Sequence, residues 1–197
     1  RAAARGRLGV PESVPLIVSV GLLVRRKGFD VLVRAMEWVR SDHPDVRLLI
    51  AGDEPDGMGG CREELEALIE ELELGECVTL LGHRGDVPEL LAACDVFVLA
   101  SREEGDPAAV LEAMATGLPV LVTEPASAAV EQFVTGLVVR PDDHLCLSQR
   151  LSILLAVPSL HDEWGQAGRR VVEARHDLDR MVRRYEEAWE SVLGSGG

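Results

Sequence analysis

Short apolar runs rich in β-branched residues alternate with helical patterns along most of this chain, and this alternation most constrains its fold. Between the runs, apolar residues recur at helical spacing, as they do within Phe29 to Arg40. Strands that alternate with helices in this way form right-handed βαβ units and a parallel sheet covered on both faces. The sequence therefore predicts an α/β, Rossmann-like fold. The predicted strands are Leu16 to Val20, Arg47 to Ala51, Val78 to Leu81, Val96 to Leu99, Pro119 to Thr123 and Leu137 to Val139.

The two ends of the chain follow different patterns. Arg1 to Pro15 is basic and has no clear period, so we expect a linker over residues 1–15 and one domain over 16–194. The chain starts with arginine rather than methionine, and we expect it to be a piece of a longer protein. After Pro141 the pattern predicts helices alone, over Leu147 to Leu155, Trp164 to Ala174 and Leu178 to Val192.

Composition and charge exclude several classes of function. The formal net charge of −14 argues against nucleic acid or an anionic membrane as a partner, since either would require a basic surface. No apolar run reaches the roughly 18 residues of a membrane span, and none reads as a signal peptide. The histidines lack metal-ligand spacing, so we expect no metal site.

The cysteines and tryptophans are both expected to be structural. No Cys-x-x-Cys pair occurs, so the cysteines predict free thiols in a reducing, cytoplasmic setting. The tryptophans fall in helical patterns, which favours packing in the core over stacking on a sugar. The residues concerned are Cys61, Cys77, Cys94 and Cys146, and Trp38, Trp164 and Trp189.

The stretch from Ser101 to Val120 carries the main functional signal. A tight turn, Glu104-Gly-Asp-Pro107, follows a buried strand, and its proline opens a helix over Ala108 to Ala115. A helix that opens directly after a strand presents free N–H groups and a positive dipole end, which suit phosphate. Glu104 and Glu112 lie before the helix and about two turns into it, so both can face a crevice at the carboxyl edge of the sheet.

These residues form the pattern Glu-Gly-x-Pro-x-x-x-x-Glu-Ala-Met-Ala-x-Gly-x-Pro-Val, with Glu104 and Glu112 as a Glu-x7-Glu pair. The pattern resembles the signature of the retaining glycosyltransferases with the GT-B fold, specifically their large group-one family of bacterial sugar transferases. The resemblance covers nearly the whole chain, but only the carboxyl-terminal, donor-binding half of that architecture. It implies that the terminal helices close this domain and cross back towards an acceptor-binding half that this chain lacks.

The resemblance also implies an activity. The expected reaction moves a sugar from a nucleotide-diphosphate sugar to an acceptor, with retention and without a cofactor. The expected partners are the nucleotide-sugar donor and an amino-terminal acceptor-binding domain of the same protein. Any contact with the inner face of a membrane would be made by that missing half.

Individual roles follow from each residue's place in the family pattern. Glu104 matches the first glutamate, which lies near the donor sugar and the leaving phosphate, and it is the predicted catalytic residue. Glu112 matches the second, which accepts hydrogen bonds from the ribose hydroxyls. Lys27 matches the diphosphate-binding lysine, a cation that binding without a metal requires. Gly21 matches the glycine that lets the backbone approach the donor, and His83 and Arg84 match the loop whose backbone meets the base. The predicted donor-binding residues are Gly21, Arg26, Lys27, His83, Arg84, Gly105, Glu112 and Glu131.

Two departures from the family pattern fall at the phosphate site. Leu22 stands where the family usually has an arginine, although Arg25 or Arg26 of the same loop can supply a guanidinium instead. Asp106 stands where an aromatic residue is usual. As an N-cap, its carboxylate would compete with a donor phosphate for the N–H groups of the helix and would repel that phosphate.

A third departure follows the Pro-Val strand. Ala126 and Ser127 stand where glycines are expected, so Glu131 is either the glutamate that follows them in the family or a surface residue of a helix. With all three departures in view, a second interpretation stays open. The chain would then be a degenerate, non-catalytic relative that serves as a structural or interaction module.

Overall fold

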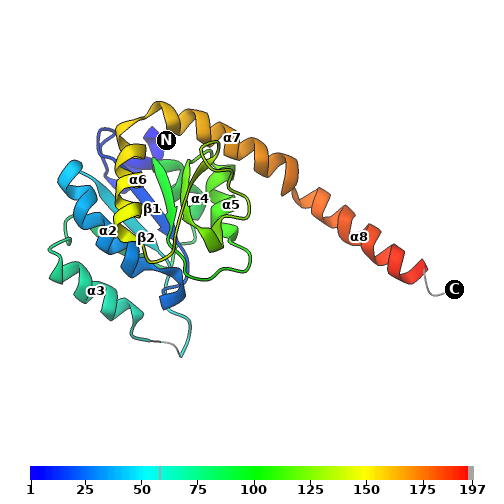
Figure 1. Ribbon diagram of the computed structural model, residues 1–197, viewed down its shortest axis with the longest axis horizontal. Helices are drawn as coiled ribbons and strands as arrows, with labels where there is room; N and C mark the ends of the chain where they lie inside the picture. Colours follow the sequence, from blue (N-terminus) through cyan, green and yellow to red (C-terminus); the bar gives the residue numbers. More distant parts are fainter. Residues whose placement is uncertain (58, 195–197) are drawn as a thin grey trace.

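A parallel sheet forms the centre of the molecule, whose computed structural model describes residues 1–57 and 59–194 (Figure 1). Within these residues the sheet has six strands in the order β3-β2-β1-β4-β5-β6. The order reverses between β1 and β4, and ligands of open α/β sheets bind at the carboxyl ends of the strands at such a point. The predicted Rossmann-like sheet is thus confirmed. The strands are β1 (Leu16–Val20), β2 (Arg47–Ala51), β3 (Val78–Gly82), β4 (Val96–Leu99), β5 (Val120–Thr123) and β6 (Gly136–Val139).

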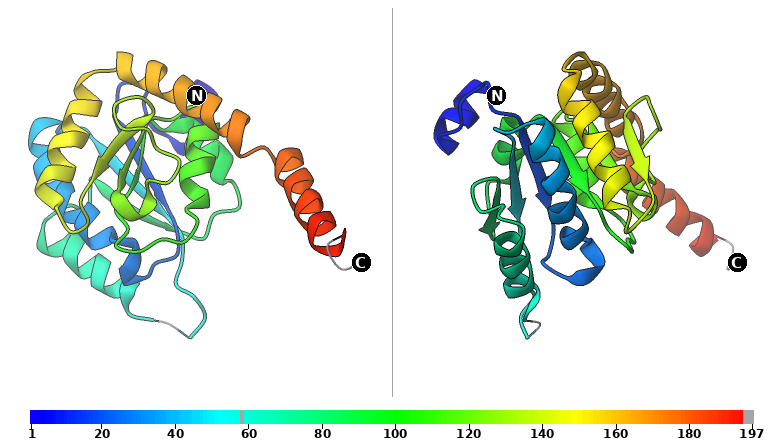
Figure 2. Two further views of the ribbon diagram at one scale, coloured as in Figure 1. Left: turned by 45° about the vertical axis from the view of Figure 1, so that its right-hand side comes forward. Right: turned by 60° about the vertical axis from the view of Figure 1, so that its left-hand side comes forward.

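Helices cover both faces of the sheet, as the strand-helix alternation predicted (Figures 1 and 2). One hydrophobic cluster lies beneath α2, α3 and α6, and the other beneath α1, α4 and α5. The helix α7 packs against α5, and α8 follows it. The helices are α1 (Ala2–Leu8), α2 (Phe29–Asp42), α3 (Cys61–Glu71), α4 (Val87–Ala93), α5 (Ala108–Ala115), α6 (His144–Ala156), α7 (Ser159–Arg175) and α8 (Leu178–Gly194), with short 3-10 turns at η1 (Arg25–Lys27) and η2 (Glu124–Ala126).

The central strands β1 and β4 are apolar, apart from Ser19 of β1, because both of their faces are buried. Ile17 of β1 belongs to the cluster beneath α2, whereas its neighbour Val18 belongs to the opposite cluster. Ile17 is aligned with Leu48 of β2 on one side and with Val96 of β4 on the other. This register fixes β1 beside β4, although most of the domain's first half separates them in sequence.

The amino-terminal segment is folded onto the sheet. Within residues 1–15, where we expected a linker, the structure has the helix α1, which packs against α4 and buries Ala4. The side chain of Arg5 is only 1% exposed and binds Asp95, which precedes β4, at 2.6 Å. The same carboxylate accepts the N–H of Leu16, the first residue of β1, at 2.8 Å. The Arg5 guanidinium also donates to the carbonyls of Ala93, Pro11, Glu12 and Val14.

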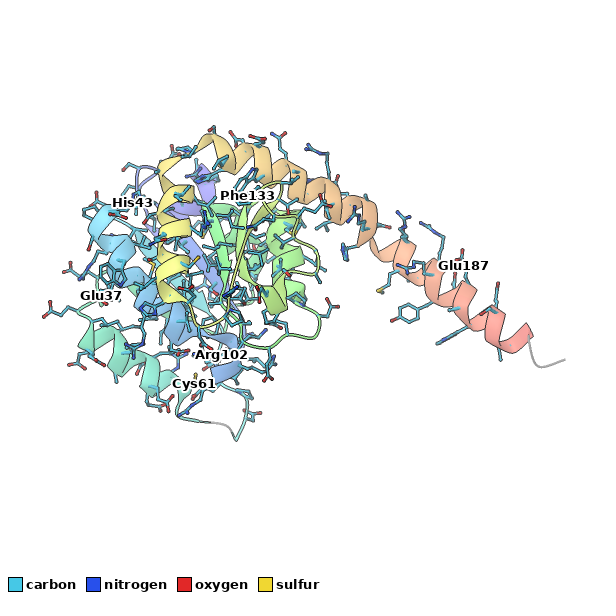
Figure 3. The ribbon with its side chains drawn as sticks, in the orientation of Figure 1. Glu37, His43, Cys61, Arg102, Phe133 and Glu187 are labelled. Carbon is cyan, nitrogen blue, oxygen red and sulfur yellow. The ribbon has the colours of Figure 1, made fainter. Side chains whose placement is uncertain are left out.

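Two of the three tryptophans do not pack in the core. Trp164 is buried, but Trp38 lies on the outer face of α2 and is exposed, and the side chain of Trp189 on α8 is 69% exposed. The expectation of core packing is therefore wrong for Trp38 and Trp189. The helix α8 extends away from the sheet, with its side chains standing apart from the body (Figures 1 and 3). Of the helices within the described residues, none is both long and apolar enough to cross a membrane.

A strained turn connects η2 to β6. Phe133 has a φ of 61°, in the left-handed region that residues with a Cβ avoid, and its side chain is 59% exposed. The turn is closed by a hydrogen bond from the Phe133 N–H to the carbonyl of Gly136 at 2.9 Å. Burial of the Phe133 ring therefore contributes little stability to offset the unfavourable backbone conformation of this residue.

Replacing Arg5 by alanine should lower the free energy of unfolding by about 3 kcal/mol, because the buried carboxylate of Asp95 then keeps only the half-exposed Arg1 as an ion-pair partner. Urea denaturation measures this loss. Arg7→Ala is the control, since Arg7 is an exposed arginine on the same helix. Equal losses in the two variants would contradict a structural role for the buried pair.

Phe133→Gly should raise the free energy of unfolding by about 0.5–1 kcal/mol, because relief of the left-handed strain exceeds the entropic cost of a glycine. Thermal unfolding measures the change. Phe133→Ala provides the control, since alanine loses the ring but keeps the Cβ that causes the strain. The interpretation fails if the glycine variant is no more stable than the alanine variant.

Candidate functional site

Two loops meet at the carboxyl ends of β1 and β4, where the strand order reverses. One loop runs from Gly21 to Gly28 after β1, and the other from Ala100 to Pro107 after β4. Gly28 has a φ of 65°, and a Cβ at this position would lie 2.0 Å from the carbonyl oxygen of Ala100. Only glycine fits such a contact between two backbones. The close approach of the loops brings their side chains together.

Lys27 and Glu104 form an ion pair at this junction. The Nζ of Lys27 lies 2.6 Å from Oε1 of Glu104, and the two side chains are only 13% and 3% exposed. The hydroxyl of Ser101 donates to the same carboxylate oxygen at 2.6 Å, and the hydroxyl of Thr123 donates to the carbonyl of Ser101. The structure thus brings together two residues that the sequence singled out from separate loops.

Lys27 is the sole lysine of the chain. The other 19 of the 20 lysine and arginine residues are arginines. This signal was present in the sequence, and we missed it. In a chain that uses arginine almost everywhere, a lysine at one buried position indicates that an ammonium is required there. An ammonium is a compact charge with three donors, whereas a guanidinium is a larger planar fork.

Gly21 lies directly after β1 and beside Lys27. A Cβ built at Gly21 would lie 3.5 Å from Cε of Lys27, which is an ordinary contact. Packing within this chain therefore tolerates a side chain at Gly21. Its carbonyl nevertheless constrains the next strand, since a Cβ on Gly52 would lie 1.8 Å from the Gly21 oxygen. The predicted role of Gly21, close approach of its backbone to a donor, stays a prediction.

Glu112 lies on the second turn of α5 and is exposed, at the helix whose first turn faces the carboxyl edge of the sheet. Within the described part of the chain its carboxylate has no hydrogen bond or ion pair. Gly105 is also exposed, in the turn before the helix. The expectation for Asp106 is wrong: Pro107 is the N-cap residue, and no side chain caps the helix. The first N–H groups of α5 thus have no competing carboxylate.

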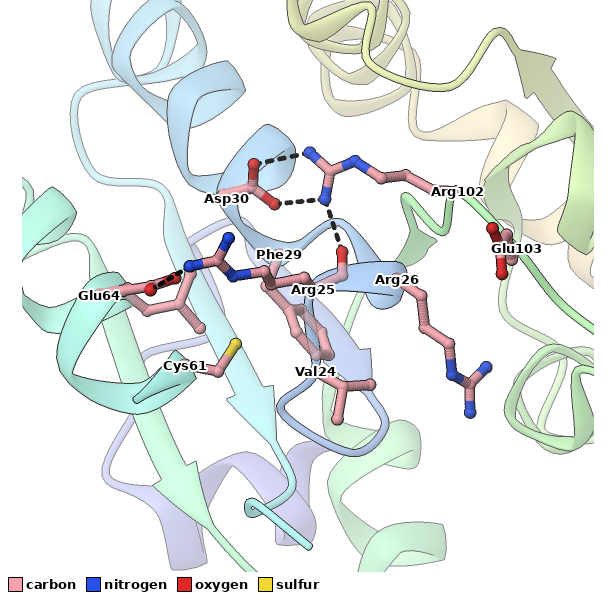
Figure 4. Close-up of a pocket in the computed structure, with 10 residues that line it drawn as sticks. Val24, Arg25, Arg26, Phe29, Asp30, Cys61, Glu64, Arg102 and Glu103 are labelled. Atoms are coloured by element: carbon pink, nitrogen blue, oxygen red, sulfur yellow. Dashed lines mark hydrogen bonds and ion pairs between the residues drawn. The ribbon is translucent and has the colours of Figure 1, made fainter. Parts of the chain in front are cut away.

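The loop after β1 offers one available arginine. Leu22 is 48% exposed, where the family usually has an arginine. Arg25 is directed to Glu64 of α3, at 2.5 Å, away from the loop that carries Glu104 (Figure 4). Arg26 points the other way and is exposed, and its side chain makes no ion pair among the residues described. Arg25 and Arg26 were the two candidates to replace the arginine that the family usually has at position 22. Among the described residues, only Arg26 is free of an ion pair.

The loop after β3 contains both residues expected near the base. His83 is exposed, while Arg84 binds Asp86 through two parallel hydrogen bonds of 2.7 and 2.5 Å. These bonds from Arg84 lower the pKa of Asp86. A guanidinium that is already held at both ends of its fork is a weaker candidate for donor binding, which leaves the backbone of this loop for the base.

Glu131 lies apart from a helix, in the loop before β6. Its carboxylate forms an ion pair of 3.3 Å with Arg175 of α7. Of the alternative that Glu131 is a surface residue of a helix, the surface position is confirmed and the helix is wrong. Its expected role towards a donor stays a prediction.

Arg102 was missed by sequence reasoning. Its guanidinium binds both carboxylate oxygens of Asp30, at 2.9 and 2.7 Å (Figure 4). Burial alone would raise the pKa of Asp30, but the hydrogen bonds and charge of Arg102 outweigh burial and lower it. The same pairing raises the pKa of Arg102. No local sequence pattern predicts the contact between Arg102 and Asp30, because 72 residues separate them.

The cysteines are free thiols without the environment of a nucleophile. Burial raises the pKa of Cys77 to about 11 and that of Cys94 to about 12. Among the described residues, no group of three or more histidine, cysteine, aspartate or glutamate side chains is arranged to hold a metal ion.

Comparisons with known proteins agree with the site and the fold. The family model described as "Glycosyl transferases group 1" matches residues 1–171. The chain is 33% identical to GDP-mannose-dependent monoacylated alpha-(1-6)-phosphatidylinositol monomannoside mannosyltransferase of Corynebacterium glutamicum, covering 97% of this chain and 51% of that protein. Thus the chain spans about half the length of the curated relatives it matches.

Solved structures show the same half-length similarity. Sucrose-phosphate synthase from Thermosynechococcus elongatus matches with a TM-score of 0.91 and 29% identity, over 100% of this chain and 50% of that one. Anabaena HepE, solved in complex with UDP and glucose, matches with a TM-score of 0.89 and 25% identity, over 96% of this chain and 51% of that one. The predicted resemblance to one half of a GT-B fold is therefore confirmed.

Proposed function

Since the chain belongs to the group 1 glycosyl transferase family, with the GT-B fold, we propose that it is the donor-binding domain of a retaining glycosyltransferase. The proposed donor is a nucleoside diphosphate sugar, and the acceptor is bound by a second domain. The observation that carries this proposal is the largely buried Lys27–Glu104 pair at the carboxyl ends of β1 and β4, where the strand order reverses. This is where an open α/β sheet binds its ligand.

The chemistry of the donor explains why such a pair is useful. When the bond between the sugar and the diphosphate breaks, negative charge develops on the departing oxygen. In the proposed complex, the Lys27 ammonium and the positive dipole end of α5, which no side chain caps, lie near that charge and stabilise it. Glu104 lies beside the donor sugar, and Glu112 accepts hydrogen bonds from the ribose. In this proposal the Lys27 ammonium and the dipole of α5 stabilise the leaving diphosphate without a metal ion.

The half-length coverage of the relatives supports a role for a second domain. A GT-B acceptor would be bound across the cleft, by residues that this chain does not contain. We therefore propose that the complete reaction requires an amino-terminal domain packed over the carboxyl edge of the sheet. Corynebacterium glutamicum mannosyltransferase and HepE are about twice the length of this chain.

A second candidate function is a non-catalytic domain that retains the fold. The observation that favours it is Leu22, an exposed apolar side chain where the family usually has a phosphate-binding arginine. Lys27 cannot replace a guanidinium in every respect, because it offers no planar fork. Direct measurement of nucleotide binding separates the two candidates.

Calorimetric titration with UDP, GDP and ADP should show saturable binding of one nucleotide, in the micromolar to millimolar range usual for enzyme substrates. Glu112→Ala should weaken this binding by about tenfold, because the ribose hydroxyls lose their charged acceptor. Glu37→Ala is the control, since it removes an exposed helical glutamate from α2. If none of the three nucleotides binds, the non-catalytic candidate replaces the enzyme.

The isolated chain should bind a nucleotide sugar but should not transfer the sugar, because the residues that hold an acceptor lie in the proposed second domain. The test incubates the chain with the nucleotide sugars of the base that binds, together with lipid and glycan acceptors, and follows release of the nucleoside diphosphate. Release that depends on an added acceptor would contradict the need for a second domain.

A further inference from the structure

We propose that Arg102 is a positioning residue that sets the reach of Lys27 towards the donor diphosphate. This inference rests on the proposed function, since it concerns the geometry of the same site. Arg102 lies two residues before Glu104, on the loop after β4. It contacts the 3-10 turn of the loop after β1 and the first turn of α2 that follows, and so it joins the two loops from which the ion pair is built.

The contacts of Arg102 enclose the turn that carries Lys27. The backbone N–H of Arg102 donates to the carbonyl of Arg26 at 2.7 Å, and its guanidinium donates to the carbonyl of Arg25 at 2.5 Å. The two bonds to Asp30 hold the first turn of α2, directly after Gly28. Thus the residues before and after Lys27 are fixed by one side chain and its own backbone.

Arg102 reaches a third segment as well. Its Nε donates to Oδ1 of Asp142 at 2.7 Å, in the turn between β6 and α6. A single guanidinium thereby fixes the turns after β1 and β6 to the loop after β4. This arrangement needs the planar fork of an arginine, because a lysine ammonium could not serve three directions with fixed geometry.

The guanidinium of Arg102 acts at a distance from the ion pair. Within the described residues it has no contact with Lys27 or Glu104, and it points towards Asp30 instead (Figure 4). Lys27 places its charge at the end of a flexible stem, so a small displacement of its turn moves the ammonium. The role of Arg102 is therefore to position Lys27, and it takes no direct part in catalysis.

The sole lysine of the chain makes this role measurable. Protein labelled with carbon-13 at the ε position of lysine gives one lysine signal in a proton-carbon correlation spectrum, and that signal reports on Lys27. Arg102→Gln should shift or broaden this signal in the nucleotide-free protein and should weaken nucleotide binding by about tenfold. Arg25→Gln is the matched control, because Arg25 and Arg102 line one pocket (Figure 4), and the substitution removes the same charge but keeps the carbonyl that Arg102 binds.

The outcomes distinguish the positioning role of Arg102 from the proposed donor-binding function. An unchanged Lys27 signal in folded Arg102→Gln, or the same shift in Arg25→Gln, would overturn the positioning role. If the wild-type chain binds no nucleotide, the proposed function fails, while the Lys27 signal still decides the role of Arg102. Should Arg102→Gln fail to fold by circular dichroism, Asp30→Asn takes its place. It removes the charge that anchors Arg102, and its Lys27 signal should move in the same direction.

Discussion

The adjacency of β1 and β4 is the constraint on which the site depends. It places two loops, distant in sequence, at one edge of the sheet and brings Lys27 within 2.6 Å of Glu104. A buried ion pair is weak evidence of stabilisation, because removing both charges from water costs about as much as their attraction returns. The pair is therefore better explained by a need for charge at this position. The rigid contact between Gly28 and Ala100 keeps the charge in place.

The two buried cations of the chain illustrate the difference between structural and functional charge. Arg5 uses its guanidinium fully, with bonds to Asp95 and to four carbonyls, so it has no capacity for a ligand. Lys27 has three donors, and in the described part of the molecule only Glu104 accepts one. A largely buried cation with unused donors at the carboxyl edge of the sheet suits an anionic ligand.

The sequence predicted the strands closely, because a buried parallel strand leaves an unbroken apolar run. Lys27, Glu104 and Glu112 came from a resemblance that rests on an extended local motif. Apart from the local error at Asp106, the main errors depended on contacts far along the chain. Arg5 looked like a linker residue until Asp95 was placed beside it, and the fork of Arg102 had no local signature. The outward direction of Trp38 also could not be read from helical spacing alone.

Arginine and lysine have different roles around this site. Arg102 uses its planar fork to join two fixed partners, Asp30 and Asp142. An arginine at position 27 could bind both oxygens of Glu104 in the same way, and the stronger pairing would withhold its charge from a ligand. Lysine binds one oxygen and can rotate its remaining donors towards a phosphate. In the proposed function, the single lysine of this chain stands where a pair must hold its geometry and still admit a third, negatively charged group.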